Sequence, residues 1–158
     1  MRFELALAVA LAATPAAAEE IAGRVTRVYD GDTLTLADRT KVRLWGIDAP
    51  ERRQECEAAS GRPYPCGERA QQALEALALN REVVCEVKDI DRYHRTVGRC
   101  EVDGMDLGAL LVRGGLAVDY RQYSKGAYAG DEHAARWARV GMWSGRFQMP
   151  AEWRRDHR

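Results

Sequence analysis

Three aspartates, a glutamate and an arginine gather in two short segments near the start of the chain. The first segment is Asp30-Gly31-Asp32-Thr33, and the second runs from Arg43 through the proline-containing corner Asp48-Ala49-Pro50-Glu51. Two carboxylates that meet in space repel each other unless a cation lies between them. The first segment alone reads as a plain turn, but the second acidic corner favours a cation-binding site.

The residues between the two segments predict the element that positions them. Leu34–Leu36 and Lys41–Leu44 have strand-like sequences, and Asp38–Thr40 has the composition of a turn, so we expect a β-hairpin. The outer ends of a hairpin lie side by side. Asp32 precedes one strand and Asp48 follows the other, so the hairpin should bring their side chains together.

The overall composition indicates one domain without a general affinity for polyanions. The chain has 158 residues, of which 46% are apolar, enough to build one core. Its 24 basic and 24 acidic residues cancel. A polyanionic partner would therefore have to be bound by local arginines rather than by a basic field.

The first eighteen residues have the features of an export signal. Arg2 supplies a basic end, Leu5–Ala13 a short apolar run, and Ala16–Ala18 a small-residue cleavage site. We expect Met1–Ala18 to be removed, leaving residues 19–158 as a single domain in the periplasm or outside the cell. The alternative is an uncleaved signal that anchors the protein, although the apolar run is short for a membrane span.

Four cysteines in an exported chain favour two disulfides. The sequence has no Cys-x-x-Cys motif and no histidine at zinc-ligand spacing. Of the three possible pairings, Cys56 with Cys66 and Cys85 with Cys100 is favoured, because each joins residues close in sequence that flank a loop or hairpin. Buried reduced thiols are the alternative if the chain is not exported.

Sequence periodicity predicts an α+β fold. Five strands are expected, at Ile21–Tyr29, Leu34–Leu36, Val42–Ile47, Val83–Val87 and Thr96–Val102, with a long loop at 48–66. Helices are expected from Gly67 to about Leu77, from Leu107 to Leu111 with Asp106 as its cap and Gly114-Gly115 as its stop, and over about Ala129–Val140. This order indicates a five-stranded OB-type Greek-key β-barrel with about three helices. An open α+β sandwich is the alternative.

Four sequence segments carry a resemblance to a known family. They are 30–33, 43–51, Asp91-Arg92-Tyr93-His94-Arg95, and Leu111-Val112-Arg113-Gly114-Gly115-Leu116-Ala117. In this order and at these separations they resemble the staphylococcal nuclease (thermonuclease) family over about residues 21–144. The resemblance implies an OB-type barrel that hydrolyses nucleic acids with the help of Ca²⁺.

The resemblance also implies roles for the acidic residues. Asp32 and Asp48 match the calcium-binding carboxylates, and the backbone carbonyl of Ala49 matches a third ligand. Calcium suits this set because it prefers hard oxygen ligands. Glu51 matches the glutamate that holds the attacking water and acts as general base. Two positions depart from the prototype: Ala49 replaces a threonine, which a backbone ligand tolerates, and His94 stands where glycine is usual.

The same resemblance implies a substrate-binding surface. Arg43 and Arg95 match the two arginines that bind the scissile phosphate, where a forked guanidinium makes paired hydrogen bonds. Tyr93, together with Tyr120 and Tyr123, corresponds to substrate-binding residues, although the spacing of the last two is one residue longer than in the prototype.

Several of these residues also have purely structural interpretations. Arg43 could pair with Glu51 or Asp48 as part of the scaffold. The terminal run Arg154–Arg158 reads as a solvated tail with weak polyanion affinity. The tryptophans expected in the core or in helix packing are Trp45, Trp137 and Trp143.

Together these features predict an exported, calcium-dependent endonuclease. It would hydrolyse the phosphodiester bonds of DNA, and of RNA as a second substrate, with little sequence preference. No stable protein partner and no membrane association after signal removal are implied, so we expect a monomer. The alternative is a non-catalytic nucleic-acid-binding OB-type module, since such folds also bind single strands. Binding alone, however, does not need two metal carboxylates.

Overall fold

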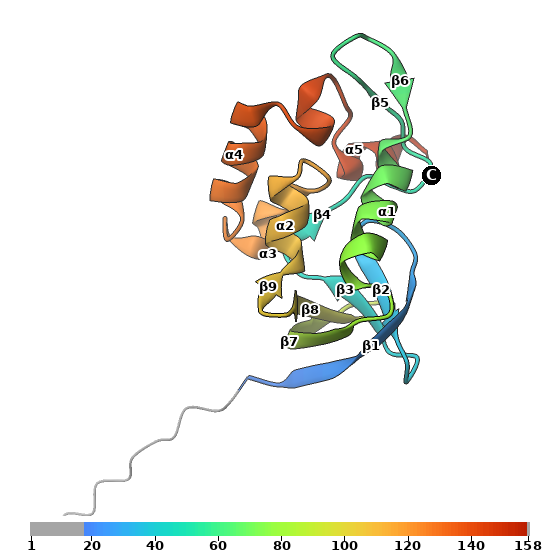
Figure 1. The fold of residues 1–158 in the computed structure, drawn as a ribbon, viewed down its shortest axis with the longest axis vertical. Coiled ribbons are helices and arrows are strands. Elements are labelled where there is room, and N and C mark those ends of the chain that lie inside the picture. Colours follow the sequence, from blue (N-terminus) through green and yellow to red (C-terminus); the bar gives the residue numbers. More distant parts are fainter. Residues whose placement is uncertain (1–17, 158) are drawn as a thin grey trace, which may run out of the picture.

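Five strands close into a small barrel that helices cover at one end (Figure 1). In the computed structural model, which describes residues 18–157, these strands are β1 (Glu20–Val28), β2 (Thr33–Leu36), β3 (Lys41–Leu44), β7 (Glu82–Ile90) and β8 (Thr96–Val102). Their order is β3-β2-β1-β7-β8, and β3 also pairs with β8 in parallel, which closes the sheet. The expected five-stranded barrel is confirmed, whereas the expected export signal lies, apart from Ala18, outside the described residues.

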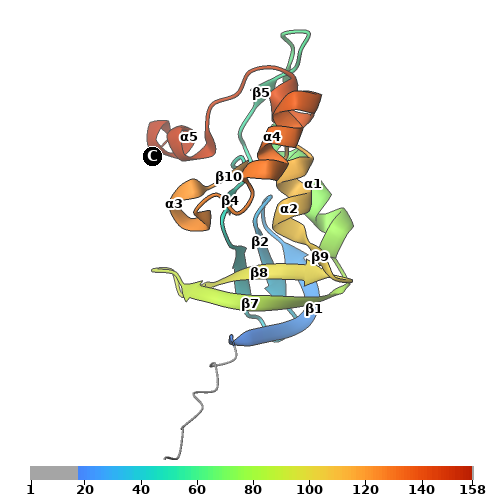
Figure 2. The same cartoon turned by 90° about the vertical axis from the view of Figure 1, so that its left-hand side faces the viewer.

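A bend in β1 allows one strand to serve two neighbours. Its second half pairs with β2, with Val25 opposite Leu36 and Arg27 opposite Thr35, and the register shifts between these pairs. Its first half pairs with β7. Such an irregularity bends a strand and increases its twist, as closure of a small barrel requires. Figure 2 shows β7 and β8 running together across the barrel.

The expected strand at Val42–Ile47 is divided in the structure. The strand β3 ends at Leu44, and Gly46 has a φ of +73°, which turns the chain away from the barrel. The next two residues form β4 (Ile47–Asp48), which pairs with β10 (Val118–Asp119) in a separate two-stranded sheet. A continuous strand was therefore the wrong expectation, and the turn carries Asp48 toward the helical end of the barrel.

The helices exceed the number expected from sequence. Three agree with the predicted segments: α1 (Cys66–Ala78), α2 (Leu107–Arg113) and α4 (Ala129–Ala138). Asp106, in the short strand β9 (Met105–Asp106), caps α2 as predicted, because its side chain accepts hydrogen bonds from the backbone N–H groups of Gly108 and Ala109. The described residues add α3 (Arg121–Ser124), the 3₁₀ helix η1 (Gly141–Ser144) and α5 (Pro150–Asp156).

The core lies between the barrel and the helices that cover it. It is built mainly from strand residues and from the inner faces of α1 and α2, including Leu34, Leu36, Val42, Leu44, Leu74, Val83, Leu107 and Leu111. Trp45 packs against this core, but Trp137 is 85% exposed, so its expected packing role was wrong. The helix α4 buries Ala135 instead. Among residues 18–157, no helix has the length and apolar character of a membrane span.

Both favoured disulfides are present. Cys85 and Cys100 face each other across β7 and β8, which fixes these two barrel strands together. Cys56 joins Cys66 at the start of α1. The segment 48–66, expected as an irregular loop, contains the hairpin of β5 (Cys56–Glu57) and β6 (Pro63–Tyr64). The disulfide and the hairpin together hold the chain that follows the acidic corner.

Candidate active site

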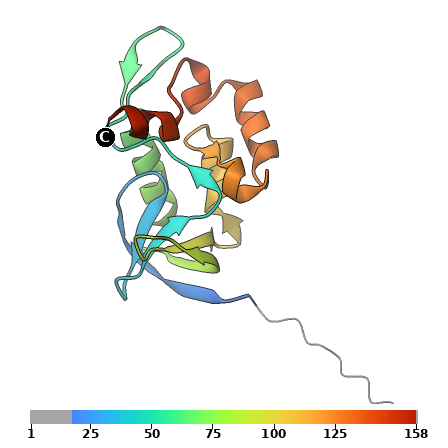
Figure 3. The same cartoon turned by 180° about the vertical axis from the view of Figure 1, so that it is seen from behind.

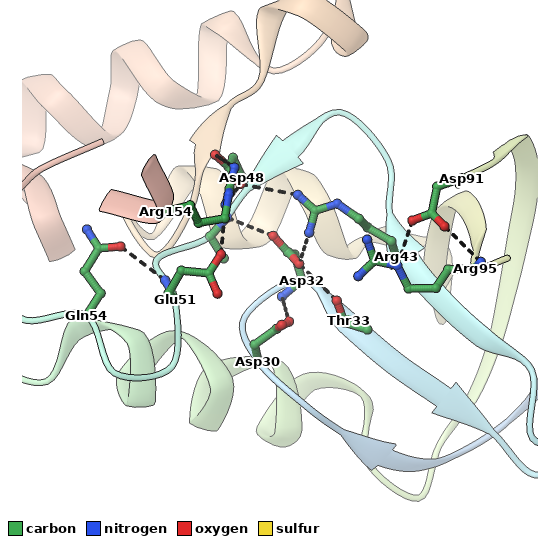
Figure 4. A network of polar contacts seen from close by, with 11 residues as sticks. Asp30, Asp32, Thr33, Arg43, Asp48, Glu51, Gln54, Asp91, Arg95 and Arg154 are labelled. Atoms are coloured by element: carbon green, nitrogen blue, oxygen red, sulfur yellow. Dashed lines mark hydrogen bonds and ion pairs between the residues drawn. The ribbon is translucent and has the colours of Figure 1, made fainter. Parts of the chain in front are cut away.

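The β2–β3 hairpin and the turn at Gly46 that follows it bring Asp32 and Asp48 to opposite sides of one guanidinium group (Figure 4). Arg43 pairs with Thr33, the first residue of β2. The arginine therefore lies at the open end of the hairpin, next to Asp32. One Nη of Arg43 forms an ion pair with Asp32, and the other lies 3.3 Å from Asp48 Oδ1. Arg43 thus pairs with both aspartates, while none of its ion pairs in the described chain involves Glu51.

The two aspartates are almost completely buried. Asp32 is 3% exposed and Asp48 is 2% exposed. Asp32 Oδ2 accepts a hydrogen bond of 3.0 Å from the backbone N–H of Ala49, and Oδ1 accepts one of 3.2 Å from the Thr33 hydroxyl. The acidic corner is therefore attached directly to the first aspartate turn, as convergence of the two sequence segments requires.

Gly31 permits this close approach. A Cβ atom at that position would lie 2.6 Å from the Cβ of Ala70 on α1 and 2.7 Å from the Cβ of Ala49. Real Cβ atoms do not approach other atoms so closely. The glycine between Asp30 and Asp32 therefore lets the turn lie between the helix and the acidic corner.

Glu51 is half-buried and is held through its backbone by Gln54. The Gln54 side chain, which is 0% exposed, accepts a hydrogen bond of 3.2 Å from Glu51 N–H and donates one of 2.7 Å to the carbonyl of Gln148. Gly67 at the start of α1 packs against the same backbone, because a Cβ there would lie 1.8 Å from the Glu51 carbonyl oxygen. These contacts hold the Glu51 main chain in place while its carboxylate remains accessible.

Arg95 is presented by a tight turn between β7 and β8. Asp91 accepts hydrogen bonds from the Arg95 backbone N–H at 3.0 Å and from its Nε at 2.7 Å. Burial acts to raise the pKa of Asp91, but these hydrogen bonds outweigh it and lower the pKa below its usual value. His94 has a φ of +60°, the conformation for which glycine is best suited. Figure 4 shows the Arg95 side chain extending toward Arg43.

The three tyrosines lie at two different places. Tyr93 is 63% exposed and its ring centroid lies 5.5 Å from the Arg95 guanidinium carbon. Tyr120 and Tyr123 form an edge-to-face pair with centroids 4.8 Å apart. The Tyr120 N–H donates a hydrogen bond of 2.8 Å to the carbonyl of Gly46, just before β4. Tyr93 thus lies beside Arg95, whereas Tyr120 and Tyr123 lie near β4, the strand that carries Asp48.

Arg154 is a site residue that the sequence interpretation missed. Its Nη1 lies 2.9 Å from both Asp48 Oδ1 and Glu51 Oε1, and its Nη2 lies 3.1 Å from Asp48 Oδ2. The expectation of a solvated tail was therefore wrong. The missed signals were those of a short helix: Pro150 at its first position, Glu152 in the first turn and arginines in the last.

Burial and charge shift the protonation equilibria of the cluster. The pKa of Asp30 is raised to about 6 by burial and by the neighbouring charge of Asp32. Burial also raises the pKa of Asp48, against the opposing effects of Arg154 and Arg43. The carboxylates in turn raise the pKa values of both arginines, although burial opposes this. The site is a network of carboxylates held together by two permanent cations.

The chemistry of this donor set fits a hard divalent cation. Asp32 and Asp48 supply buried carboxylate oxygens, and Ala49 is adjacent to both, which is consistent with a carbonyl ligand. Within residues 18–157, no group of three or more His, Cys, Asp or Glu side chains is arranged to hold a metal. The predicted calcium ligands include only two such side chains, Asp32 and Asp48, together with the carbonyl oxygen of Ala49. In this structure both carboxylates are in contact with arginines.

The closed barrel with its covering helices defines an OB-type α+β protein, and comparison with known sequences defines the family. A family model described as "Staphylococcal nuclease homologue" matches residues 41–145. The chain therefore belongs to the staphylococcal nuclease family. The matched segment includes β3, the acidic corner and the turn that presents Arg95.

Three similar proteins span most of the chain. Protein ParB of Escherichia coli is 38% identical over 99% of this chain and 91% of its own length. Micrococcal nuclease of Shigella flexneri is 36% identical over 96% of this chain and 90% of its own length. Succinoglycan biosynthesis protein ExoI of Rhizobium meliloti is 40% identical over 80% of this chain, which covers 66% of that protein.

Proposed function

We propose that the protein is an exported, calcium-dependent nuclease that hydrolyses phosphodiester bonds of DNA, and of RNA as a second substrate, with little sequence preference. Residues 1–18 would be the export signal and residues 19–158 the single nuclease domain. The observation that carries the proposal is the convergence of Asp32, Asp48 and Arg43 at the end of one hairpin, beside Glu51.

The arginines would bind the scissile phosphate. Arg43 lies on β3 and Arg95 in the turn before β8, and Figure 4 shows the Arg95 side chain extending toward Arg43. Each carries a planar fork of donors that can hydrogen-bond two phosphate oxygens. Asp91 holds Arg95 through its Nε, at 2.7 Å. These donors would strengthen their contacts as negative charge builds on the phosphate in the transition state.

The acidic residues would divide two tasks. Asp32, Asp48 and the carbonyl of Ala49 would hold calcium, which polarises the phosphate when it is bound. Glu51 would orient and deprotonate the attacking water, since its carboxylate is half-buried while its backbone is held in place by Gln54. The Tyr93 ring and the Tyr120–Tyr123 pair would contact the nucleotides on either side of the phosphate.

The disulfides support an exported protein. The structure contains the disulfides Cys56–Cys66 and Cys85–Cys100, and such bonds persist in oxidising compartments such as the periplasm or the extracellular space. Cleavage after Ala18 would release the domain from its signal. We propose that the protein acts as a monomer, since one chain supplies every group that the proposed mechanism uses.

Hydrolysis of denatured DNA and of RNA tests this proposal. Glu51→Gln removes the proposed base but keeps the size of the side chain, and it should lower turnover by about 10²-fold or more. Glu55→Gln is the matched control, because Glu55 is an exposed residue of the same loop, and it should retain wild-type turnover. Binding of both nucleic acids without hydrolysis by the wild type would instead support a non-catalytic OB-type module.

A further inference from the structure

The C-terminal helix α5 inserts a positive charge among the carboxylates of the site. Arg154 reaches Asp48 with both of its terminal nitrogens, at 2.9 and 3.1 Å. One of these nitrogens also lies 2.9 Å from Glu51. Figure 4 shows the Arg154 side chain between these two carboxylates, with Arg43 on the other side of Asp48.

These contacts use the oxygens that a divalent cation would need. Each Asp48 carboxylate oxygen accepts a hydrogen bond from Arg154. Calcium binds such oxygens directly, and a guanidinium group in contact with them would also repel the ion. Full coordination by Asp48 and full pairing with Arg154 therefore exclude one another.

The attachment of α5 is suited to displacement. The helix has seven residues, and helices of that length are not stable alone in water. Of its seven residues only Pro150 is buried, and the carbonyl of Gln148, two residues before Pro150, accepts a hydrogen bond of 2.7 Å from Gln54. The Trp153 ring of α5 stacks on the ring of His157, the residue that follows the helix, with ring centroids 4.1 Å apart. Figure 3 shows α5, in dark red, against the segment that follows β4.

Arg154 is also more accessible than Asp48, the buried carboxylate that it contacts with both terminal nitrogens. Its side chain is 32% exposed, as is that of Glu51, whereas that of Asp48 is 2% exposed. The arginine can therefore leave toward solvent, where its charge is hydrated, without disrupting the barrel. A buried aspartate cannot move in the same way, so Asp48 stays in position when its partner changes.

We propose that Arg154 is a displaceable competitor of calcium: it neutralises Asp48 and Glu51 in the resting protein and must leave before calcium is fully coordinated. This inference rests on the calcium dependence proposed above. It implies that removal of Arg154 strengthens calcium binding in the absence of any nucleic acid. Displacement would also free the Glu51 carboxylate from its arginine partner.

Calorimetric titration of calcium into the nucleic-acid-free protein tests this competition. Arg154→Met removes the charge but keeps an aliphatic stem, and the dissociation constant for calcium should fall by about tenfold or more, the scale of a lost charge-assisted hydrogen bond. Arg155→Met is the matched control, because Arg155 lies on the same helix but contacts Glu152, at 3.9 Å. It should bind calcium as the wild type does.

A second variant separates competition from damage to the fold. Arg154→Lys keeps the charge but loses the fork, so its dissociation constant should lie between those of the wild type and Arg154→Met. Equal or weaker calcium binding by both Arg154 variants, with the wild type binding normally, would overturn the inference and leave the calcium site intact. Failure of all four proteins to bind calcium would overturn both the inference and the proposed calcium dependence.

Discussion

Replacement of Arg43 by lysine should reduce both turnover and stability, for different reasons. In the structure Arg43 bridges Asp32 and Asp48, which are 3% and 2% exposed. A lysine ammonium keeps the charge but cannot reach both carboxylates with a planar fork. One buried carboxylate would lose a charge-assisted hydrogen bond, worth about 1.5–3 kcal/mol. Because the contact to Asp48 is long, at 3.3 Å, we expect the lower end of that range.

Expressed as an activation free energy, the loss of turnover should exceed the loss in free energy of unfolding. Removal of one donor to a charged transition state typically costs about 10²-fold in rate, equivalent to about 2.7 kcal/mol of barrier. We expect Arg43→Lys to lower turnover on denatured DNA by that factor or more. The measurements are initial rates at saturating substrate and urea-induced unfolding of the metal-free protein.

Arg95→Lys is the matched comparison. Arg95 pairs with Asp91, and these side chains remain 24% and 19% exposed, so we expect the pair to contribute about 1 kcal/mol, less than a pair with a buried carboxylate. The variant should therefore lose turnover as Arg43→Lys does, with little change in stability. Near-normal turnover of Arg43→Lys would reduce Arg43 to a structural partner. Equal destabilisation by the two substitutions would refute the reasoning from burial.

Three further predictions concern the turn, the helix contact and maturation. His94→Gly should keep turnover and change stability by no more than about 1 kcal/mol in urea unfolding, because glycine adopts the positive φ without a side-chain penalty; complete loss of activity would show that the imidazole has a chemical role. Gly67→Ala should greatly lower turnover and also stability, because its Cβ would overlap the Glu51 carbonyl; wild-type rates and melting temperature would contradict this packing. Intact mass of protein isolated from the native compartment should show removal of Met1–Ala18 and no free thiols; a retained signal or four alkylatable thiols would exclude the proposed export.

Much of the fold could be predicted from the sequence, because the local signals for strands and helix caps agree with the structure that forms. The strand at Thr96–Val102 and the capping of α2 by Asp106 were predicted correctly, since alternation and cap chemistry act over a few residues. The division of Val42–Ile47 was not predicted, because the turn at Gly46 depends on pairing of β4 with the distant strand β10. Tertiary pairing there overrides a continuous apolar pattern.

The candidate site was predictable where motifs are contiguous and was missed where they are not. The convergence of Asp32 and Asp48 followed from the hairpin between them. Arg154, in contrast, lies more than a hundred residues from Asp48 in sequence, with a separation of 106. Its basic run is equally compatible with a tail, and only the packing of α5 against the acidic corner distinguishes the two. Long-range charge pairing of this kind leaves no periodic signal in a single sequence.

Hydrolysis of denatured DNA by the purified domain, measured with calcium and again after a chelator is added, tests the central claim most directly. The account predicts rapid cleavage in calcium, loss of cleavage on chelation, and its return when calcium is restored in excess. The same assay on Asp48→Asn should show nearly no cleavage in either condition, because an amide is a weaker ligand for a hard cation. Cleavage by the wild type that is indifferent to the chelator, or no cleavage in calcium, would contradict the account.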